Sequence, residues 1–238
     1  MKKFIFLAAL VASVFGAELV KPYDDGFRLS VSEMNELANP SRLSWRIFYD
    51  KPSSGANAAW FDAVKKGDLA KVKTMLAAGQ DIEAKDEASL GQTALGWAAF
   101  IGYEDMVDFL IASGASLFAT DRGDVYNVLK SAVLGKNVKI VKKIYGNLSP
   151  YNLNDQSVES DGETLLMVAA SNDRRQIVEF LLSQGADINL VTTTKDKSLG
   201  AYNQSALSYA CTRGLKDMQA LLIKHGAINH RTSKASCE

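Results

Sequence analysis

The sequence predicts an all-α solenoid in which about five helix pairs stack on one another. Three observations lead to this prediction. A pattern of the type small-x-Leu-x-x-Ala-Ala recurs five times, at residues 58–64, 93–99, 127–133, 164–170 and 205–211. A second segment with apolar residues at helical spacing follows each copy, and four of these segments end in glycine. Because one helix pair cannot bury its apolar face alone, repeated pairs are expected to stack around a continuous core.

Residues 1–17 have the arrangement of a secretory signal. Lys2 and Lys3 precede an apolar run of about a dozen residues, and Gly16 and Ala17 follow it. The run is too short to span a bilayer comfortably. A first buried helix is the alternative, although no polar face interrupts the run. We therefore expect a periplasmic or secreted protein, cleaved after Gly16 or Ala17, with no membrane insertion once the signal is removed.

Residues 18–57 are expected to form an N-terminal arm. Ser30 to Glu33 reads as a capping box that opens a short helix over residues 33–38. The apolar residues between 45 and 49 are too many for a free linker. We expect the arm to pack on the first helix pair and to shield that end of the solenoid. A partner-binding arm is the alternative.

The repeats divide the rest of the chain into units near 58–91, 92–125, 126–159, 163–196 and 204–229, followed by a C-terminal tail at 230–238. Thr93, Thr164 and Ser205 are residue types that cap helix N-termini. The terminal glycines suit the left-handed residue that ends a helix, and they are Gly79, Gly114, Gly185 and Gly226. The third unit lacks this glycine and has Lys143 at a usual core position, so we interpret it as a degenerate copy.

The most regular unit runs from residue 164 to 189 and ends in Gly185-Ala186-Asp187-Ile188-Asn189. This pattern resembles the ankyrin repeat, and the resemblance covers about residues 58–229. Gly96, Met167 and Ser208 depart from the family, which usually has histidine there. The chain resembles exported bacterial members of this family. The resemblance implies a non-catalytic module that binds another protein through a concave groove and the fingers between repeats. A monomer is expected.

The family pattern also implies which residues face a partner. The two residues after each Ala-Ala pair would face the groove, and the fingers would line the same side. The expected contact residues are Lys65, Lys66, Phe100, Ile101, Leu134, Ser171, Asn172, Thr212 and Arg213 in the groove, and Ser89, Leu90, Gln92, Asp161, Glu163, Tyr202 and Gln204 in the fingers. Phe100, Ile101 and Leu134 would form an exposed apolar patch, or else pack inside if the third unit shifts the register.

An insertion at residues 191–202 lengthens the finger between the fourth and fifth units, where the spacing between repeats reaches 41 residues. Insertions in repeat proteins map to loops, often on the binding face. Long loop insertions also cost little free energy, so a solvated insertion without function is an equal alternative.

Composition argues against several other functions. The 27 basic and 27 acidic residues give no net charge, which disfavours nucleic acid as a partner. Phosphate-loop, zinc-protease and nucleophile-elbow motifs are absent from the sequence, and the two histidines leave little material for catalysis. We expect a protein that has no enzymatic activity, no cofactor and no metal site. The second hypothesis, on family analogy alone, is a stress-response or cofactor-handling accessory to a catalase-like antioxidant enzyme.

One group of cysteines and histidines has side chains of the kind that ligate metals, namely Cys211, His225, His230 and Cys237. Their spacing matches no standard zinc motif. A disulfide between Cys211 and Cys237 is more plausible than a metal site in an exported protein, because an oxidising compartment preserves such bonds. A buried, unbonded Cys211 packed against the next helix is the other possibility.

Overall fold

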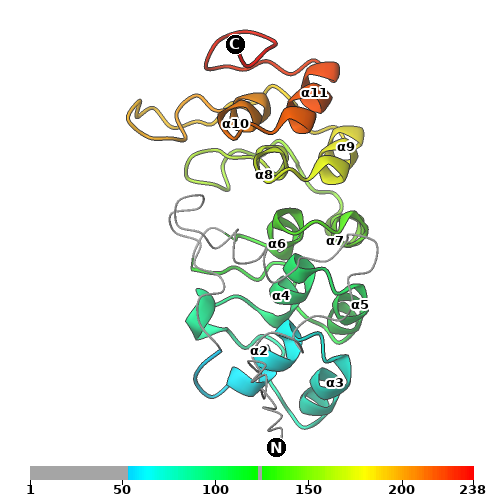
Figure 1. The fold of residues 1–238 in the computed structure, drawn as a ribbon. Helices are drawn as coiled ribbons and strands as arrows, with labels where there is room; N and C mark the ends of the chain where they lie inside the picture. Colours follow the sequence, from blue (N-terminus) through cyan, green and yellow to red (C-terminus); the bar gives the residue numbers. More distant parts are fainter. Residues whose placement is uncertain (1–52, 123–124) are drawn as a thin grey trace, which may run out of the picture.

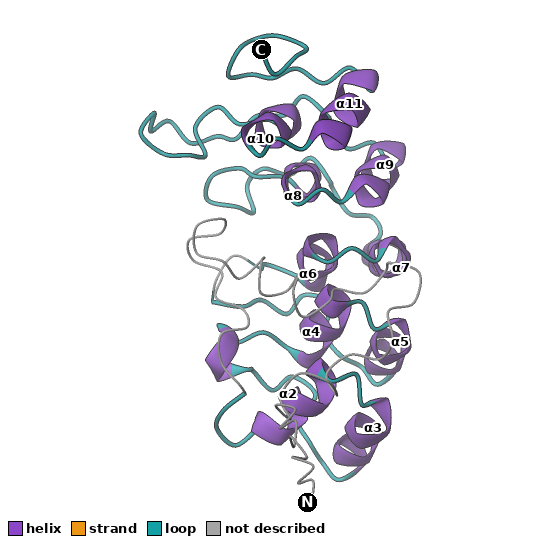
Figure 2. Cartoon of the chain, viewed as in Figure 1, coloured by secondary structure: helices purple, strands orange, loops and turns teal. Residues whose placement is uncertain are grey.

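The computed structural model describes residues 53–122 and 125–238, and within them the fold is all-α (Figures 1 and 2). Ten α-helices and one short 3-10 helix, η1 at Glu87–Ser89, are described. The α-helices are α2 (Ala58–Lys65), α3 (Leu69–Ala77), α4 (Ala94–Ile101), α5 (Glu104–Ala112), α6 (Val128–Leu134), α7 (Val138–Leu148), α8 (Leu165–Ser171), α9 (Arg175–Ser183), α10 (Ala206–Thr212) and α11 (Lys216–Lys224). None is long and apolar enough to cross a membrane.

The helices form two columns, as Figure 1 shows. The first helix of every pair stands in an inner column, and the second stands in an outer column beside it. Loops that we call fingers connect each outer helix to the next inner helix, and they project on the side away from the outer column. Neighbouring inner helices contact each other, as α4 does α6 and α8 does α10. The predicted solenoid of stacked helix pairs is confirmed.

Three inner helices begin at the residues that the sequence predicted. The Thr93 hydroxyl accepts a hydrogen bond from the backbone N–H of Gly96 at 3.1 Å. The Thr164 hydroxyl accepts from the backbone N–H of Met167, and the Ser205 hydroxyl accepts from that of Ser208, each at 3.4 Å. Each hydroxyl satisfies one of the N–H groups that the first turn leaves without a partner. The four terminal glycines all have positive φ, as expected of helix C-termini.

One position in the outer helices shows how the repeats share a core. The fourth residue of α3, α5, α7 and α9 is a fully buried valine, namely Val72, Val107, Val141 and Val178. Burying such a side chain stabilises the fold by about 1.5–3 kcal/mol. The fifth unit has Gln219 instead, and its amide donates to the carbonyl of Ala210 at 3.0 Å. That hydrogen bond satisfies a polar group that would otherwise be costly to bury.

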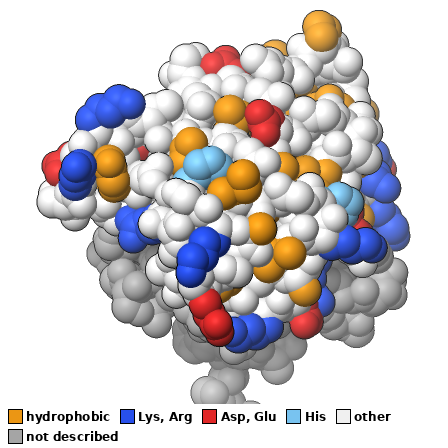
Figure 3. Space-filling model, turned by 90° about the horizontal axis from the view of Figure 1, so that it is seen from above, with side chains coloured by type: hydrophobic (Ala, Val, Ile, Leu, Met, Phe, Trp, Pro, Cys, Tyr) orange, Lys and Arg blue, Asp and Glu red, His pale blue; other side chains and the backbone are white. Residues whose placement is uncertain are grey.

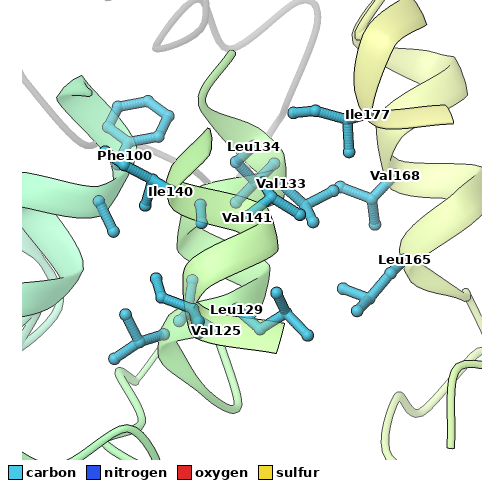
Figure 4. Close-up of a cluster of buried hydrophobic side chains, with 14 of the residues drawn as sticks. Phe100, Val125, Leu129, Val133, Leu134, Ile140, Val141, Leu165, Val168 and Ile177 are labelled. Atoms are coloured by element: carbon cyan, nitrogen blue, oxygen red, sulfur yellow. The ribbon is translucent and has the colours of Figure 1, made fainter. Parts of the chain in front are cut away.

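The third unit is a complete helix pair rather than a degraded one. Its outer helix, α7, is the longest described, with 11 residues. The expectation that Lys143 occupies a core position is wrong, because Lys143 is exposed and forms an ion pair with Asp108 of α5. Ile140 and Ile144 fill the core instead, together with Val141 (Figure 4).

The third unit also buries a lysine in its inner helix. Lys130 of α6 is fully buried, and its ammonium group pairs with Glu159 and lies 5.5 Å from the centre of the Tyr126 ring. A buried charge is tolerated only when it is paired in this way. The expected signal peptide and most of the expected arm, including the helix over 33–38, lie outside the described residues.

Candidate interaction surface

The first finger, residues 86–92, is fixed to the body by a buried polar cluster. The ammonium group of Lys65 lies 2.6 Å from Oδ2 of Asp86, and Trp97 donates its indole N–H to the same oxygen at 3.0 Å. Lys65 also lies 4.7 Å from the centre of the Trp97 ring. Lys65, predicted to face a partner, therefore has a structural role at this finger. Its neighbour Lys66 is exposed, as expected.

Two predicted contact residues of the first finger point inward. Ser89 and Gln92 are buried, so the prediction that they line the surface is wrong. A side chain at Gly96 would place its Cβ 1.9 Å from Oε1 of Gln92, so this glycine makes room for the glutamine. The Gln92 amide donates to Ser131 of the next unit at 3.1 Å. Leu90 is half-buried in a left-handed conformation.

The same rule explains two other predicted finger residues. Ser208, another small residue at the position of Gly96, donates its hydroxyl to the inward-turned Gln204 at 2.7 Å. The prediction that Gln204 lines the surface is therefore also wrong. Met167 fills this position in the fourth unit, and there Glu163 remains half-buried at the surface. In these three units, the side chain four residues earlier turns inward where this position holds glycine or serine, and it stays at the surface where the position holds methionine.

The expected apolar patch is not exposed. Phe100, Ile101 and Leu134 are only 5%, 1% and 2% exposed, and they belong to the hydrophobic core (Figure 4). The ends of α4 and α6 come so close that a Cβ at Gly135 would lie 2.5 Å from the carbonyl oxygen of Phe100. The alternative that these side chains pack inside is the arrangement found.

The remaining groove residues divide between buried and exposed. Ser171 is buried, and its hydroxyl donates to the carbonyl of Val168 at 3.1 Å. Asn172 is half-buried and donates to the same carbonyl at 2.8 Å. Thr212 and Arg213 at the end of α10 are exposed, as expected of contact residues.

The third finger (residues 155–163) and the fourth finger (residues 191–204) are joined at their bases. The backbone N–H of Thr193 donates to the carbonyl of Asp161 at 2.6 Å. The Gln156 amide donates to the carbonyls of Gly162 and Val191, at 2.8 and 2.6 Å. These hydrogen bonds join two loops far apart in sequence into one surface, which we call the double finger.

The double finger presents apolar side chains to solvent. Val158 is 41% exposed and Leu199 is 51% exposed, one on each finger. Seen from the C-terminal end, the fourth finger projects from the body and has basic, acidic and hydrophobic side chains (Figure 3). Tyr202, predicted to face a partner, is half-buried near its base, and Asp161 is half-buried on the third finger. Sequence reasoning missed Val158 and Leu199, although each is a lone apolar residue in a polar stretch.

Carboxylates lie close to tyrosines beside the double finger. The pKa of Tyr209, on α10, is raised above its ordinary value by burial and by the negative charges of Glu163 and Asp161. Burial, the neighbouring Tyr151 and two glutamates likewise raise the pKa of Tyr126. Both phenols therefore remain neutral hydrogen-bonding groups at physiological pH.

The C-terminal tail holds the fourth finger from outside. The Arg231 guanidinium donates to the carbonyls of Gly200 and Tyr202, at 3.0 and 3.1 Å, and the Asn203 amide donates to the carbonyl of His230 at 2.6 Å. The tail is itself joined to α10 by a disulfide between Cys211 and Cys237, whose Cα atoms lie 5.3 Å apart. The expected insertion is thus an ordered, braced loop.

The two histidines do not join the cysteines in a metal site. His225 is exposed at the end of α11, and a ring nitrogen of His230 lies 3.1 Å from the carbonyl of Ile228. Among residues 53–122 and 125–238, no three histidine, cysteine or acidic side chains are grouped so that they could hold a metal ion.

Comparison with known proteins agrees with this architecture. A family model described as ankyrin repeats (3 copies) matches residues 60–155 and 129–234. The chain is 27% identical over 165 residues to the ankyrin repeat and KH domain-containing protein mask-1 of Caenorhabditis elegans, which covers 69% of this chain and 6% of that protein. It is 33% identical over 130 residues to a putative ankyrin repeat protein of Rickettsia felis, covering 54% of this chain and 41% of the relative.

A third relative, the palmitoyltransferase AKR1 of Lachancea kluyveri, is 26% identical over 159 residues, which are 67% of this chain and 20% of the relative. The chain therefore covers less than half of the length of each of these relatives. The repeats are what the proteins share, and such repeats act as protein-binding modules. With its stacked helix pairs and a family model that matches most of its length, the chain belongs to the ankyrin-repeat family.

Proposed function

We propose that the protein is an exported, non-catalytic binding module that captures a partner protein with its double finger. The observation that carries this proposal is the exposure of Val158 and Leu199 on two loops joined by one backbone hydrogen bond and by the Gln156 amide. Large apolar side chains exposed on a rigid surface often mark protein contacts, because their burial on binding is favourable.

The surroundings of these two residues suit a protein partner. Asp161 and Glu163 provide acceptors, and Tyr202 provides an aromatic anchor. Tyrosine is enriched among the residues that contribute most to binding energy. The bracing by Arg231 reduces the conformational entropy that the fourth finger would lose on binding.

Two features support export to the periplasm. The first seventeen residues have the pattern of a signal peptide, and the structure contains a disulfide, a bond that persists in oxidising compartments. A C-terminally tagged protein expressed in a Gram-negative host should appear in the periplasmic fraction with the mass of a chain starting at residue 17 or 18. An unprocessed cytoplasmic chain would reject this part of the proposal.

The binding surface is tested with a matched pair of variants. Val158→Asp/Leu199→Asp should lower capture of a partner from periplasmic extract at least about tenfold, since it places charge where apolar area is buried. The control is Phe118→Asp, which removes a side chain that is 70% exposed but lies between α5 and α6, outside the double finger. Circular dichroism should show the same helicity in all three proteins. Equal capture by the double variant and the wild type would reject the double finger as the binding surface.

A further inference from the structure

The disulfide between Cys211 and Cys237 lies at the surface of the last unit. Cys237 is half-buried, and its neighbours Ala235 and Glu238 in the C-terminal tail are exposed. Cys211 is also half-buried, in the last turn of α10. Reductants reach disulfides at a surface, whereas a disulfide inside a core is shielded from them. The sequence has two cysteines in all, so a reductant acts on this protein through one bond.

The disulfide lies beside the core of the last unit and not within it. Leu207 of α10 is fully buried, as are Met218 and Leu222 of α11, and these side chains hold the two helices together. Of residues 230–238, all of which the structure describes, Cys237 is the one apolar residue that packs against the core. Opening the bond therefore frees the tail and leaves the apolar contacts between the helices in place.

The tail forms a small loop that is fixed at two points. At the first point, the backbone N–H of Asn229 donates to the carbonyl of Lys234 at 2.8 Å, and the Asn229 amide donates to the carbonyl of Ser236 at 3.3 Å. At the second point, the disulfide joins Cys237 to α10. Arg231 lies between these points and donates to two carbonyls of the fourth finger. A reduced tail loses the second point, so Arg231 is no longer held from both sides.

We propose that this bond is a redox switch, which a protein dithiol opens in the folded protein to release the fourth finger and lower partner capture by the double finger. Cys237 is the sulfur open to attack, because its neighbours in the tail are exposed and Cys211 lies in a helix. A thiolate of the dithiol attacks Sγ of Cys237, the S–S bond breaks, and Cys211 leaves as a thiolate that takes up a proton. The second thiolate of the dithiol then attacks the first sulfur of the dithiol and releases Cys237, which also takes up a proton. The dithiol ends as a disulfide and has passed two electrons and two protons to the chain.

A dithiol suits this bond better than a single thiol does. After the first step the reductant is bonded to Cys237, and the Cα of Cys211 lies only 5.3 Å from that of Cys237 in the folded protein. Cys211 is thus well placed to attack again and restore the original bond. A second thiol in the same reductant competes with this reversal, because its effective concentration at the mixed disulfide is high.

Release of the tail lowers binding because the fourth finger loses its order. Leu199 and Tyr202 lie on this finger, and a loosened finger must be ordered again when a partner binds. The fraction of molecules that are ready to bind then falls, and the apparent affinity falls by the same factor. This last step rests on the proposed function, whereas the exchange reaction does not.

Trapping of the mixed disulfide tests the exchange reaction. The probe is a thioredoxin whose second active-site cysteine is changed to serine, which stops the reaction after the first step. It should form an adduct with the oxidised, folded protein in the absence of denaturant. After alkylation, trypsin digestion should place the adduct on residues 235–238, which contain Cys237, and not on residues 198–213, which contain Cys211. No adduct, an adduct on the second peptide, or an adduct that forms only in urea would overturn the proposal.

Partner capture tests the consequence of reduction. Wild type that has been reduced with thioredoxin, alkylated and freed of reductant should capture about threefold less partner from periplasmic extract than the oxidised wild type, with the same helicity by circular dichroism. Cys211→Ser/Cys237→Ser is the control, and the same treatment should leave its capture unchanged. Arg231→Ala should lose less capture on reduction than the wild type, because its tail no longer holds the finger through this side chain. Equal capture by the oxidised and reduced wild type, or an equal loss in Arg231→Ala, would overturn the proposal.

The proposed function and the switch fail in different ways. If oxidised Val158→Asp/Leu199→Asp captures as much partner as the oxidised wild type, the double finger is not the binding surface. That result rejects the proposed function, and with it the last step of the switch. If that variant loses capture and reduction of the wild type does not lower it, the switch alone is rejected.

Discussion

The first and fourth fingers occupy the same place in their repeats, but different contacts hold them. The first finger is held from within, by Asp86, Lys65 and Trp97 in a buried cluster. The fourth finger is held from outside, by Arg231 of a disulfide-linked tail. Leu90 of the first finger is half-buried, whereas Leu199 of the fourth finger is 51% exposed. Of these two fingers, the fourth is therefore the one that presents a large exposed apolar side chain to a partner.

The largest effect is expected from breaking the internal cluster. Asp86→Ala would leave the Lys65 charge and the Trp97 N–H without their shared acceptor. We expect a loss of about 4 kcal/mol in the free energy of unfolding, typical of removing one partner from a buried ion pair. Urea denaturation measures this loss. Glu87→Ala is the control, because it removes an exposed ion pair with Arg122 from the same finger and should cost less than about 0.5 kcal/mol.

The next effect concerns the disulfide. Cys211→Ser/Cys237→Ser opens a link between residues 26 positions apart, and the loss of stability should be about 3 kcal/mol. Trypsin should also cleave faster after Lys195 and Lys197, while cleavage after Lys85 near the first finger should not change. Equal protection of Lys195 in the variant would show that the tail does not brace the fourth finger. Mass measurement with and without reductant checks the bond directly.

A smaller effect is expected from the bracing side chain alone. Arg231→Ala removes the hydrogen bonds to the carbonyls of Gly200 and Tyr202 but keeps the disulfide. The cost should be about 1 kcal/mol, confined to the fourth finger. Trypsin cleavage after Lys195 should rise less than it does in the cysteine variant. A larger rise than in that variant would reverse the assigned roles of side chain and disulfide.

The smallest effect depends on pH. Burial and the charges of Glu163 and Asp161 raise the pKa of Tyr209 in the folded state, whereas an unfolded tyrosine ionises near pH 10. Below pH 10 both states keep the proton, so the group has no effect on stability. Above pH 10 only the unfolded state releases it, and stability falls as pH rises. Tyr209→Phe should therefore lose less stability between pH 10 and 11.5 than the wild type, as urea denaturation at both values would show.

Much of the fold could be predicted because its signals are local. Helix caps such as Thr93 depend on a few neighbouring residues, and the apolar spacing of α5 or α9 depends on one helix. The candidate surface depends on packing between units, which the sequence does not display. Gln92 turns inward only because Gly96 leaves room, and Phe100 is buried because α6 ends against it. Lys143 occupies the position that Phe109 and Phe180 hold in other units, where those side chains are only half-buried, so an exposed lysine paired with Asp108 fits there.

Hydrogen exchange in the oxidised and the reduced protein tests the difference between the two fingers most directly. The backbone N–H of Thr192 donates to Gln204 across the base of the fourth finger, and that of Asp86 donates to Gln92 across the first. We predict that reduction of the disulfide speeds exchange at Thr192 and Thr193 and leaves exchange at Asp86 unchanged. Unchanged exchange at Thr192, or an equal rise at Asp86, would contradict the conclusion that the tail holds the fourth finger in place.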